Sequence, residues 1–532
     1  MVSATVDPVA SRGNAAGGPP AAARRETTNR PTAGLPWTVW TLALVIVVIE
    51  LAFGPRYGLF RDEYYYLACA DHLGWGYVDH PPLSIAVLAA VRAVLGDSLP
   101  AVRLVPALLG GTLVVLGALL ARALGGGRRA QLLGAVAVAA VPEYLGQAGC
   151  YSMNILDTTC WAVAALLLAR LAPDERGWRR FVTLGVVLGL GLLNKLSLLF
   201  FGAGLAVALI VTPLRRLLLK PGPWLAAVIA ALLFAPHVLW QVANGFPTRE
   251  FIENATRYKN VALTPLQFLG GSLLDMNPVT APLWIAGLGW LLLARRAQRF
   301  RSLGIVYLVA FAILAAQHSK PYYLAPAYPP LLAAGAVLLE GARRRWMTAA
   351  TGAVLLVAGA ALAPFAIPAL PVETFIAYQH WLGVSPPQSE RAAQGLLPQF
   401  FADHFGWPEL TQAVADVYRS LPADEQRRVA IVTSNYGEAG ALNYLGRRYG
   451  LPPAVSQHNS FYLWGPGRDR VDVAIVVGMN PENLGSSWSS VEVGGRWYSP
   501  YAMPWQHRWP ILVCRGLKIP LPEAWRRGKH FI

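Results

Sequence analysis

The amino-acid sequence predicts a multi-pass α-helical membrane protein, with about 11 transmembrane helices and a C-terminal α/β domain outside the membrane. Of the 532 residues, 55% are hydrophobic and only 14% are charged, and the mean hydropathy of +0.41 lies outside the usual range of soluble globular proteins. Apolar stretches dominate between Trp37 and Pro368, whereas the sequence after about residue 370 is polar. We therefore expect one membrane domain, residues 37–370, followed by one extracytoplasmic domain, residues 371–532.

The first 36 residues are rich in Ala, Gly, Pro and Thr, contain no apolar run and include Arg12, Arg24, Arg25 and Arg30. This composition predicts a disordered cytoplasmic tail, and we expect no cleavable signal peptide before the first span. The formal net charge of the chain is +16. Because Lys and Arg also determine the topology of membrane proteins, this charge does not require nucleic acid, and we expect no nucleic-acid partner.

Eleven candidate spans follow from cutting the chain at its charge clusters and at Pro and Gly breaks. A helix needs about 20 mostly apolar residues to cross a hydrocarbon layer of roughly 30 Å. The spans are predicted at 37–53, 99–122, 130–149, 154–172, 178–193, 196–212, 223–240, 279–294, 302–317, 322–340 and 346–368.

Positive charges fall on alternate connections of this topology. With the Arg-bearing tail inside, every second connection is cytoplasmic, and the positive-inside rule is met at each. These connections hold Arg122/Arg128/Arg129, Arg176/Arg179/Arg180, Arg215/Arg216/Lys220, Arg295/Arg296/Arg299/Arg301 and Arg343/Arg344/Arg345.

The apolar segment Leu83–Leu95 is too short to cross the membrane, and counting it as a span would place every later positive cluster outside. We therefore predict that it is a helix on the outer membrane surface, within an outer loop spanning residues 54–98. A second long outer segment covers 241–278, and the odd number of spans places the C-terminal domain outside.

The C-terminal domain is predicted to be α/β. Strand-like runs at 429–433, 471–477 and 511–514 alternate with helical patterns near 408–421 and 437–448. The segment Ser434–Gly440 follows a strand and opens a helix but lacks the glycine spacing of a nucleotide site, so we expect a tight turn there.

Ionisable and polar aromatic residues gather at the outer ends of the spans. Helix-end charges can be simple interfacial anchors. Carboxylates gain little from that position, however, and cost about 2.5 to 3.5 kcal/mol where they enter the bilayer core. A shared cleft on the outer side is therefore predicted from Arg61, Asp62, Glu63, Asp71, Asp79, His80, Glu143, Asp157, Asn194, Lys195, His237, His318, Lys320, Tyr322 and Tyr323.

This set of residue types suits phosphoryl-linked chemistry. Carboxylates serve as general bases or metal ligands, whereas Lys, Arg and His bind phosphate. A lipid phosphate is the expected partner for cations at the depth of the bilayer surface. If the substrate is a sugar on a polyprenyl phosphate, the phosphate is already a good leaving group, so one base and several cations are sufficient.

At these residues the chain resembles the integral-membrane glycosyltransferases of the GT-C fold, family 39 type, which includes protein O-mannosyltransferases and lipid A aminoarabinose transferases. The resemblance covers nearly the whole chain. Its motifs are Phe60-Arg-Asp-Glu-Tyr64, Asp79-His-Pro-Pro-Leu83, Met153-Asn-Ile-Leu-Asp157, Leu192-Leu-Asn-Lys-Leu196 and Ser319-Lys-Pro-Tyr-Tyr-Leu-Ala-Pro-Ala-Tyr-Pro329.

The resemblance and the position of the charges together suggest roles for several residues of the predicted cleft, and Tyr322 and Tyr323 either stack on a sugar or anchor their helix. Asp62 is the expected catalytic base, and Glu63 is expected to orient Asp62 or the acceptor. Candidates for the donor phosphate are His80, Lys195, Lys320 and Arg61, and candidates for the substrate are Glu143, His237, Tyr322 and Tyr323. His80 stands where many relatives have Lys, so a phosphate contact there is expected to depend on pH near neutrality.

The resemblance leaves a divalent cation, Mg²⁺ or Mn²⁺, open. Asp62 and Asp157 share such an ion only if the fold brings them close together.

The leading hypothesis is a glycosyltransferase in a bacterial plasma (inner) membrane. It would move a sugar from a polyprenyl-phosphate-linked donor to a lipid, glycan or protein acceptor on the outer face. A transporter or flippase is the alternative, but its site is expected near the bilayer midplane. A third reading is a non-catalytic membrane scaffold, in which the C-terminal domain binds a protein partner.

Overall fold

The structure is a computed structural model that describes residues 34–342, 344–385, 390–391 and 393–532. Its internal contacts divide the chain into two compact units, Met1–Gly34 and Leu35–Ile532. Residues 1–33 of the predicted tail and Arg343 of one positive cluster lie outside the described residues.

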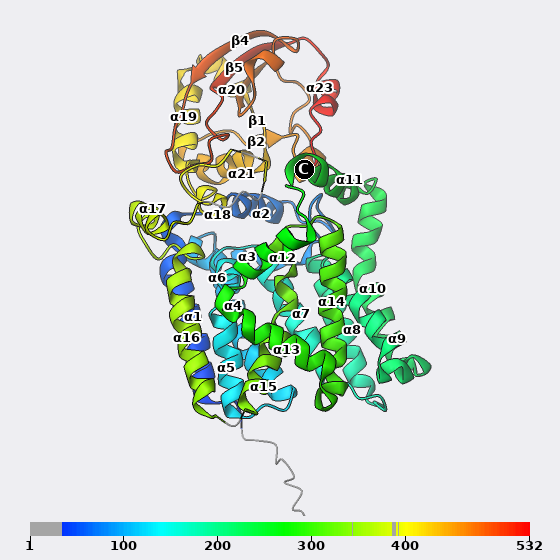
Figure 1. Ribbon diagram of the computed structural model, residues 1–532. Helices are drawn as coiled ribbons and strands as arrows, with labels where there is room; N and C mark the ends of the chain where they lie inside the picture. Colours follow the sequence, from blue (N-terminus) through cyan, green and yellow to red (C-terminus); the bar gives the residue numbers. More distant parts are fainter. Residues whose placement is uncertain (1–33, 343, 386–389, 392) are drawn as a thin grey trace, which may run out of the picture. The chain divides into compact units, whose positions relative to one another are not determined.

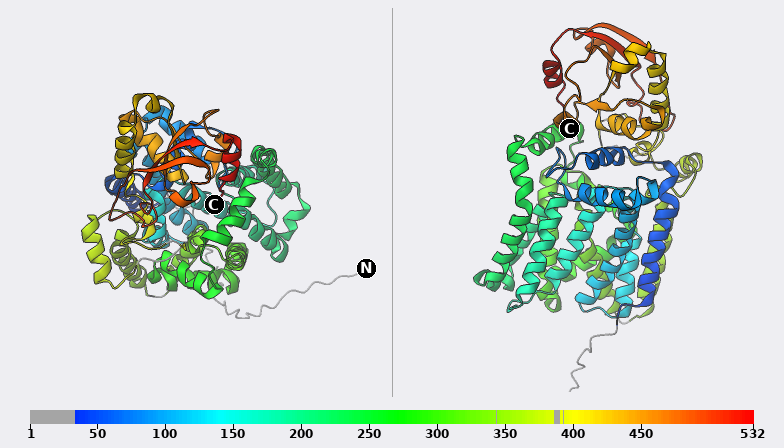
Figure 2. Two further views of the ribbon diagram at one scale, coloured as in Figure 1. Left: turned by 90° about the horizontal axis from the view of Figure 1, so that it is seen from above. Right: turned by 180° about the vertical axis from the view of Figure 1, so that it is seen from behind.

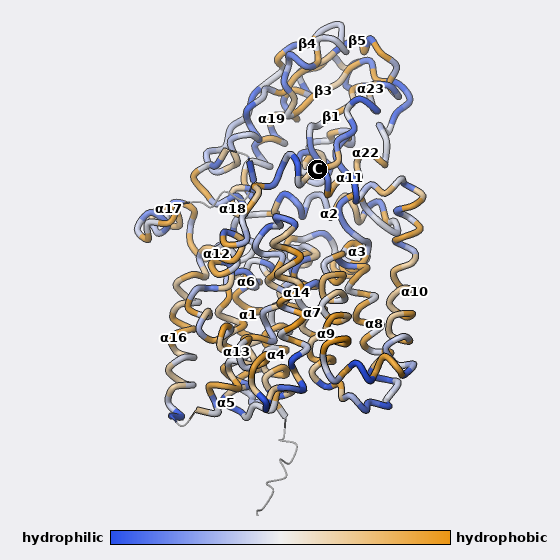
Figure 3. Tube along the Cα trace, turned by 45° about the vertical axis from the view of Figure 1, so that its right-hand side comes forward, coloured by the Kyte–Doolittle hydropathy of each residue, from blue (hydrophilic) through white to orange (hydrophobic). Residues whose placement is uncertain are grey.

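Long apolar helices form the membrane part of the chain. Within the described ranges, five helical stretches are long and apolar enough to span a membrane, or up to nine if each of four bent pairs is one span. Figure 3 shows their hydrophobic character along most of their length. The five are α1 (Trp37–Phe53) with η1 (Gly54–Tyr57), α4 (Leu99–Ala123), α10 (Pro221–Ala243), η5 (Arg295–Phe300) with α14 (Arg301–Ala316), and α16 (Trp346–Leu362) with η7 (Ala363–Phe365).

The four bent pairs break where a proline opens the second helix, because proline has no N–H to continue the hydrogen-bond ladder. The bends are 63°, 99°, 98° and 54°. In chain order the pairs are α5 (Arg128–Ala139) with α6 (Pro142–Gly149), α9 (Leu198–Val211) with η2 (Pro213–Leu219), α12 (Pro265–Asp275) with η4 (Pro278–Thr280) and α13 (Ala281–Leu293), and η6 (Pro321–Ala327) with α15 (Pro329–Glu340).

Two further helices occupy predicted spans but are only 17 residues long, α7 (Met153–Ala169) and α8 (Trp178–Asn194). Every one of the eleven predicted segments therefore contains helix, while the count of eleven crossings stays a prediction. A hydropathy pattern does not record a bend, so it marks an apolar segment as one continuous span even where the backbone turns at a proline.

Two helices cross the ends of the membrane helices beneath the C-terminal domain (Figures 1 and 2). They are α2 (Arg61–Asp71) and α3 (Leu83–Leu95), and α3 has the bounds predicted for the surface helix. The second outer segment forms α11 (Pro247–Asn254) and a π-helical turn, η3 (Ala255–Lys259). These elements lie between the membrane helices and the sheet.

The C-terminal domain is built on a mixed five-stranded sheet of order β2-β1-β3-β5-β4. Strand β1 pairs in parallel with β2 and β3, whereas β5 pairs antiparallel with β3 and β4. The strands are β1 (Ala430–Thr433), β2 (Ala454–Ser456), β3 (Val473–Val477), β4 (Trp488–Gly495) and β5 (Ile511–Leu517).

Three of these strands were predicted, and two were missed. β2 has only three residues, and β4 is a largely exposed edge strand without an apolar run, so neither leaves a clear sequence pattern. Before the sheet, α17 (Val372–Trp381) and α18 (Gln399–Ala402) lie near the ends of the membrane helices, where Phe375 packs against Phe365 and Phe401 (Figure 1). The sheet domain also contains α19 (Trp407–Ser420), α20 (Ala423–Arg428), α21 (Tyr436–Leu445), η8 (Gly446–Tyr449), α22 (Ser460–Trp464), η9 (Pro481–Asn483) and α23 (Leu521–Arg527).

The segment Ser434–Gly440 is the turn into α21, and it packs directly on α2. Asn435 caps α21 by accepting a hydrogen bond from the backbone N–H of Glu438. A Cβ at Gly437 would lie 2.5 Å from Cγ of Arg61, and one at Gly440 would lie 2.7 Å from the backbone of Tyr64. These glycines therefore allow the C-terminal domain to approach the helix that carries Asp62.

We expect Gly440→Ala to weaken this contact by about 1–3 kcal/mol, because the added methyl group meets backbone atoms that cannot move aside. Thermal unfolding of the detergent-solubilised protein measures the change. Gly485→Ala is the control, since nothing lies within 4 Å of a Cβ at that position. Equal unfolding temperatures for the two variants would contradict the packing argument.

Candidate active site

Asp62 and its neighbour Glu63 lie in the first turn of α2, but their side chains have opposite environments. The helix begins at Arg61, and Glu63 accepts a hydrogen bond from the backbone N–H of Phe60 at 2.7 Å. Carboxylates at these positions are stabilised by the free N–H groups of a helix start. Glu63 is fully buried, whereas the side chain of Asp62 is 35% exposed.

Glu63 is saturated by hydrogen bonds. Arg103 of α4 donates to it from Nε at 2.9 Å and from Nη2 at 2.6 Å, and the backbone N–H of Tyr151 donates at 2.7 Å. Arg103 also donates to the carbonyl oxygens of Gly54 and Gly58. A carboxylate held in this way cannot exchange protons with a substrate, so the geometry supports an orienting role for Glu63.

Asp62 is held from two sides. The hydroxyl of Tyr436, at the start of α21, donates to Asp62 Oδ1 at 2.9 Å, and Arg61 Nε lies 3.4 Å from the same oxygen. Arg61 is itself buried, with Nη1 3.4 Å from Asp403 Oδ2. The C-terminal domain therefore supplies both a hydroxyl to Asp62 and a counter-charge to its neighbour.

A second group of predicted residues surrounds Lys195, which follows α8. Lys195 Nζ donates to Asn154 Oδ1 at 2.8 Å, lies 3.8 Å from Asp157 Oδ2 and faces the rings of Tyr323 and Tyr322 at 4.9 and 5.8 Å. The buried Asp157 also accepts a hydrogen bond from Ser197 Oγ at 2.5 Å.

Glu143 lies next to this group. It accepts a hydrogen bond from Gln147, and Tyr322 interacts electrostatically with both Glu143 and Asp62. The structure thus gathers Asp157, Lys195, Tyr322 and Tyr323 in one group, and a cleft shared by this group and Asp62 stays a prediction.

The third group surrounds Lys320, whose Nζ donates to Glu390 Oε1 at 2.7 Å. Lys259 Nζ lies 3.8 Å from the same oxygen. Burial raises the pKa of the Glu390 carboxyl, but Lys259, Lys320 and Arg61 outweigh it and lower that pKa to about 2. Glu390 is therefore a carboxylate at any physiological pH.

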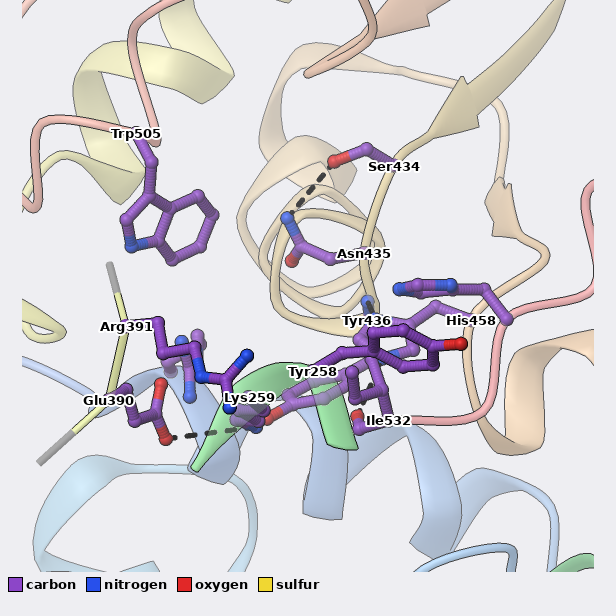
Figure 4. A pocket seen from close by; sticks show the side chains of 12 residues that line it. Tyr258, Lys259, Glu390, Arg391, Ser434, Asn435, Tyr436, His458, Trp505 and Ile532 are labelled. Atoms are coloured by element: carbon purple, nitrogen blue, oxygen red, sulfur yellow. Dashed lines mark hydrogen bonds and ion pairs between the residues drawn. The ribbon is translucent and has the colours of Figure 1, made fainter. Parts of the chain in front are cut away.

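A pocket of about 390 Å³ opens beside this third group (Figure 4). Its basic side is formed by Arg61, Lys259 and Arg391, and its aromatic side includes Tyr258, Tyr436 and Trp505. Both Arg61 and Tyr436 contact Asp62, so the base candidate lies directly behind the pocket wall.

Two predicted residues make their contacts elsewhere. His80 is buried, lies parallel to the ring of Tyr66 and has Nε2 4.0 Å from Asp79 Oδ1. His237 of α10 is hydrogen-bonded through Nδ1 to the carbonyl oxygen of Trp75 at 3.0 Å. The contacts of His237 thus connect α10 with the first outer loop, and the substrate role expected for it stays a prediction.

The arrangement does not fit a divalent cation held by Asp62 and Asp157. Among the described residues, no group of three or more His, Cys, Asp or Glu side chains is placed to hold a metal ion. Asp157 is instead paired with Lys195 and Ser197, and Asp62 with Arg61 and Tyr436.

The sequence did not single out Arg103, Lys259, Glu390 or Tyr436. Arg103 is a charge within an apolar segment, and that signal alone would have identified it. Lys259, Glu390 and Tyr436 lie in polar segments where one charged or aromatic residue resembles another, so only the fold identifies them.

The chain has the GT-C fold that the sequence suggested. It superimposes on the crystal structure of ArnT from Cupriavidus metallidurans bound to undecaprenyl phosphate with a TM-score of 0.57 and 17% sequence identity, covering 90% of this chain and 97% of that one. The apo structure of the same protein gives a TM-score of 0.55 at 16% identity, with the same coverage.

Residues 79–240 match the family model described as dolichyl-phosphate-mannose-protein mannosyltransferase. No curated protein matches the chain in sequence. The matched segment begins at Asp79 and includes the motifs around Asp157 and Lys195.

We expect Glu63→Gln to destabilise the protein by about 3–5 kcal/mol, because it leaves the buried Arg103 guanidinium without a counter-charge. Thermal or denaturant unfolding in detergent measures the loss. Arg249→Gln is the control, since it breaks an exposed ion pair with Glu253 and is expected to change nothing measurable. Wild-type stability in Glu63→Gln would contradict the role assigned to the pair.

His404 gives the structure a pH dependence. Burial, followed by the charge of Arg103, lowers the pKa of His404 to about 4, and the ring is hydrogen-bonded to the carbonyl oxygen of Gly58. In the unfolded chain its pKa is about 6.5, so the unfolded state binds the proton first and stability falls as the pH falls from about 6.5 to about 4.

Burial raises the pKa of the adjacent Asp403 to about 6, which acts in the opposite direction as the pH falls below 6. Comparing His404→Gln with wild type isolates the histidine, and the variant is expected to lose less stability between pH 7 and pH 4. Unfolding curves at a series of pH values test this, and identical pH dependence in both proteins would contradict it.

Proposed function

We propose that the protein is a glycosyltransferase that uses a polyprenyl-phosphate-linked sugar as donor. The observation that carries this proposal is the setting of Asp62: a partly exposed carboxylate, held by Tyr436 and Arg61, next to cations on one side of the membrane helices. The fold supports it, since ArnT, which has the same fold, has been crystallised with undecaprenyl phosphate.

The reaction needs a base and a site for the phosphate. Asp62 takes the proton from an acceptor hydroxyl or amine as the acceptor atom bonds to the anomeric carbon, and the bond from that carbon to the phosphate oxygen breaks. The polyprenyl phosphate leaves with the electron pair, so no general acid is required. Cations preorganised near the phosphate stabilise the charge that develops on it.

Lys195, Lys320 and Arg61 are the phosphate candidates that the geometry supports best. Arg61 lines the pocket and pairs with Asp62, and Lys320 pairs with Glu390, which also lines the pocket. Lys195 lies beside Tyr322, which interacts electrostatically with Asp62. Tyr322 and Tyr323 present ring faces on which a sugar can stack.

A transporter or flippase fits the arrangement less well. Such proteins bind their substrate near the bilayer midplane between broken helices. Here Asp62 belongs to α2, which lies between the membrane helices and the C-terminal domain (Figure 1), while Lys259 ends η3 and Lys320 directly precedes η6.

We further propose a bacterial plasma (inner) membrane location, with the N-terminus in the cytoplasm and the C-terminal domain outside. The alternation of positive clusters along the chain supports this orientation. A lipid, glycan or protein on the outer face is the proposed acceptor, reaching Asp62 from the side of the C-terminal domain.

The test is sugar transfer in proteoliposomes from a panel of labelled polyprenyl-phosphate sugars, with membrane extract as the acceptor source. Asp62→Asn is nearly isosteric but removes the base, and we expect transfer to fall by about 10²-fold or more while donor binding persists. Asp71→Asn is the matched control, because Asp71 ends the same helix and pairs with Arg92 and Arg447.

Wild-type rates in Asp62→Asn would rule out Asp62 as the base. Failure of the wild type to consume any donor would contradict the proposed function itself.

A further inference from the structure

Glu390 occupies an unusual position for a carboxylate in this site. Its backbone forms a bridge with Asn260, and the N–H of Arg391 donates to the carbonyl oxygen of Lys259. This pairing brings the Glu390 side chain to Lys259, and Lys320 reaches it from the connection before η6. Two segments far apart in the sequence thus place their lysines on one carboxylate oxygen.

Glu390 is paired with two lysines at once. Among the described residues, Glu390 is the sole carboxylate that forms an ion pair with either Lys259 or Lys320. The third nearby cation, Arg61, has Asp62 and Asp403 as its own partners. Two lysine side chains therefore meet one carboxylate oxygen at a site that is largely shielded from water.

The pocket shown in Figure 4 adjoins this cluster and has room for a ligand. Its volume of about 390 Å³ falls within the range of small-molecule sites. Lys259, Glu390 and Arg61 all line it, so a group entering the pocket meets the Glu390 carboxylate and the cations together. The Glu390 backbone is held by its bridge, and its side chain also accepts a hydrogen bond from Gln399 Nε2 at 3.0 Å, so a ligand that replaces the carboxylate has to displace this contact as well.

We propose that Glu390 holds the place of a phosphate group, and that a phosphate-bearing ligand binds in this pocket by replacing the Glu390 carboxylate between Lys259 and Lys320. A phosphate offers three acceptor oxygens and up to two negative charges, so it matches two lysines better than one carboxylate does. Glu390 keeps the lysines paired while the site is free, and it competes with the ligand.

This inference rests on the proposed function, because the phosphate of the donor lipid is the ligand expected in the pocket. Its test measures ligand binding alone and does not require sugar transfer. The inference adds Lys259 to the phosphate candidates and assigns Glu390 as an internal competitor. The same chemistry is offered by a soluble phosphate, and the experiment separates the two sources.

Binding is measured on the full chain in detergent micelles by titration calorimetry. The probes are undecaprenyl phosphate, undecaprenol as the same lipid without phosphate, and inorganic phosphate. If the Glu390 side chain is away from the two lysines in about one molecule in ten, only that fraction is competent to bind the phosphate. Glu390→Gln is then expected to tighten undecaprenyl phosphate binding about tenfold. Lys259→Gln is expected to weaken it, and undecaprenol binding is expected to stay the same in every variant.

Glu250→Gln is the matched control, because Glu250 pairs with Lys529 at 2.6 Å, close to the 2.7 Å of the Glu390 pair. It should leave phosphate binding unchanged. Glu390→Asp keeps the negative charge on a shorter side chain, so its affinity is expected to lie between those of wild type and Glu390→Gln. This variant keeps the test decisive if Glu390→Gln folds poorly.

Unchanged or weaker phosphate binding in well-folded Glu390→Gln overturns the inference, even if transfer depends on Asp62. Tighter binding of undecaprenyl phosphate supports it, even if no sugar is transferred, in which case the proposed function fails by itself. Tighter binding of inorganic phosphate alone supports the phosphate site and identifies its ligand as soluble rather than lipid-borne.

Discussion

The buried ion pair between Glu63 and Arg103 is the interaction on which the geometry of the site depends. It joins the start of α2 to α4, and Arg103 extends it to the carbonyl oxygens of Gly54 and Gly58. The desolvation cost of two buried charges is offset only when their hydrogen bonds are complete, as they are here. With Glu63 held inside, the adjacent side chain of Asp62 faces out of the helix toward the C-terminal domain.

The C-terminal domain is part of the site rather than an appendage to it. It contributes the Tyr436 hydroxyl to Asp62 and the Asp403 carboxylate to Arg61, and the segment that leads into it contributes Glu390 to the two lysines. Glycines at the start of α21 allow the close approach that these contacts need. An acceptor that reaches Asp62 therefore has to pass surfaces from both parts of the chain.

Electrostatic pairing gives the site its resting state. Lys195 is paired with Asp157, and Lys320 and Lys259 are both paired with Glu390. Such pairing reduces the cost of keeping charged groups away from water.

The sequence by itself determined the membrane class, the bounds of the helix Leu83–Leu95, three of the five strands and the grouping of Lys195 with Tyr322. Hydropathy and charge are properties of short segments of the sequence, so the pattern of residues in each segment is sufficient to predict these features. Only the tertiary structure decided that Glu63 is locked to Arg103 and that Lys320 meets Glu390. These pairings join segments 40 and 70 residues apart, and their geometry depends on how helices pack and bend at prolines, which no local pattern encodes.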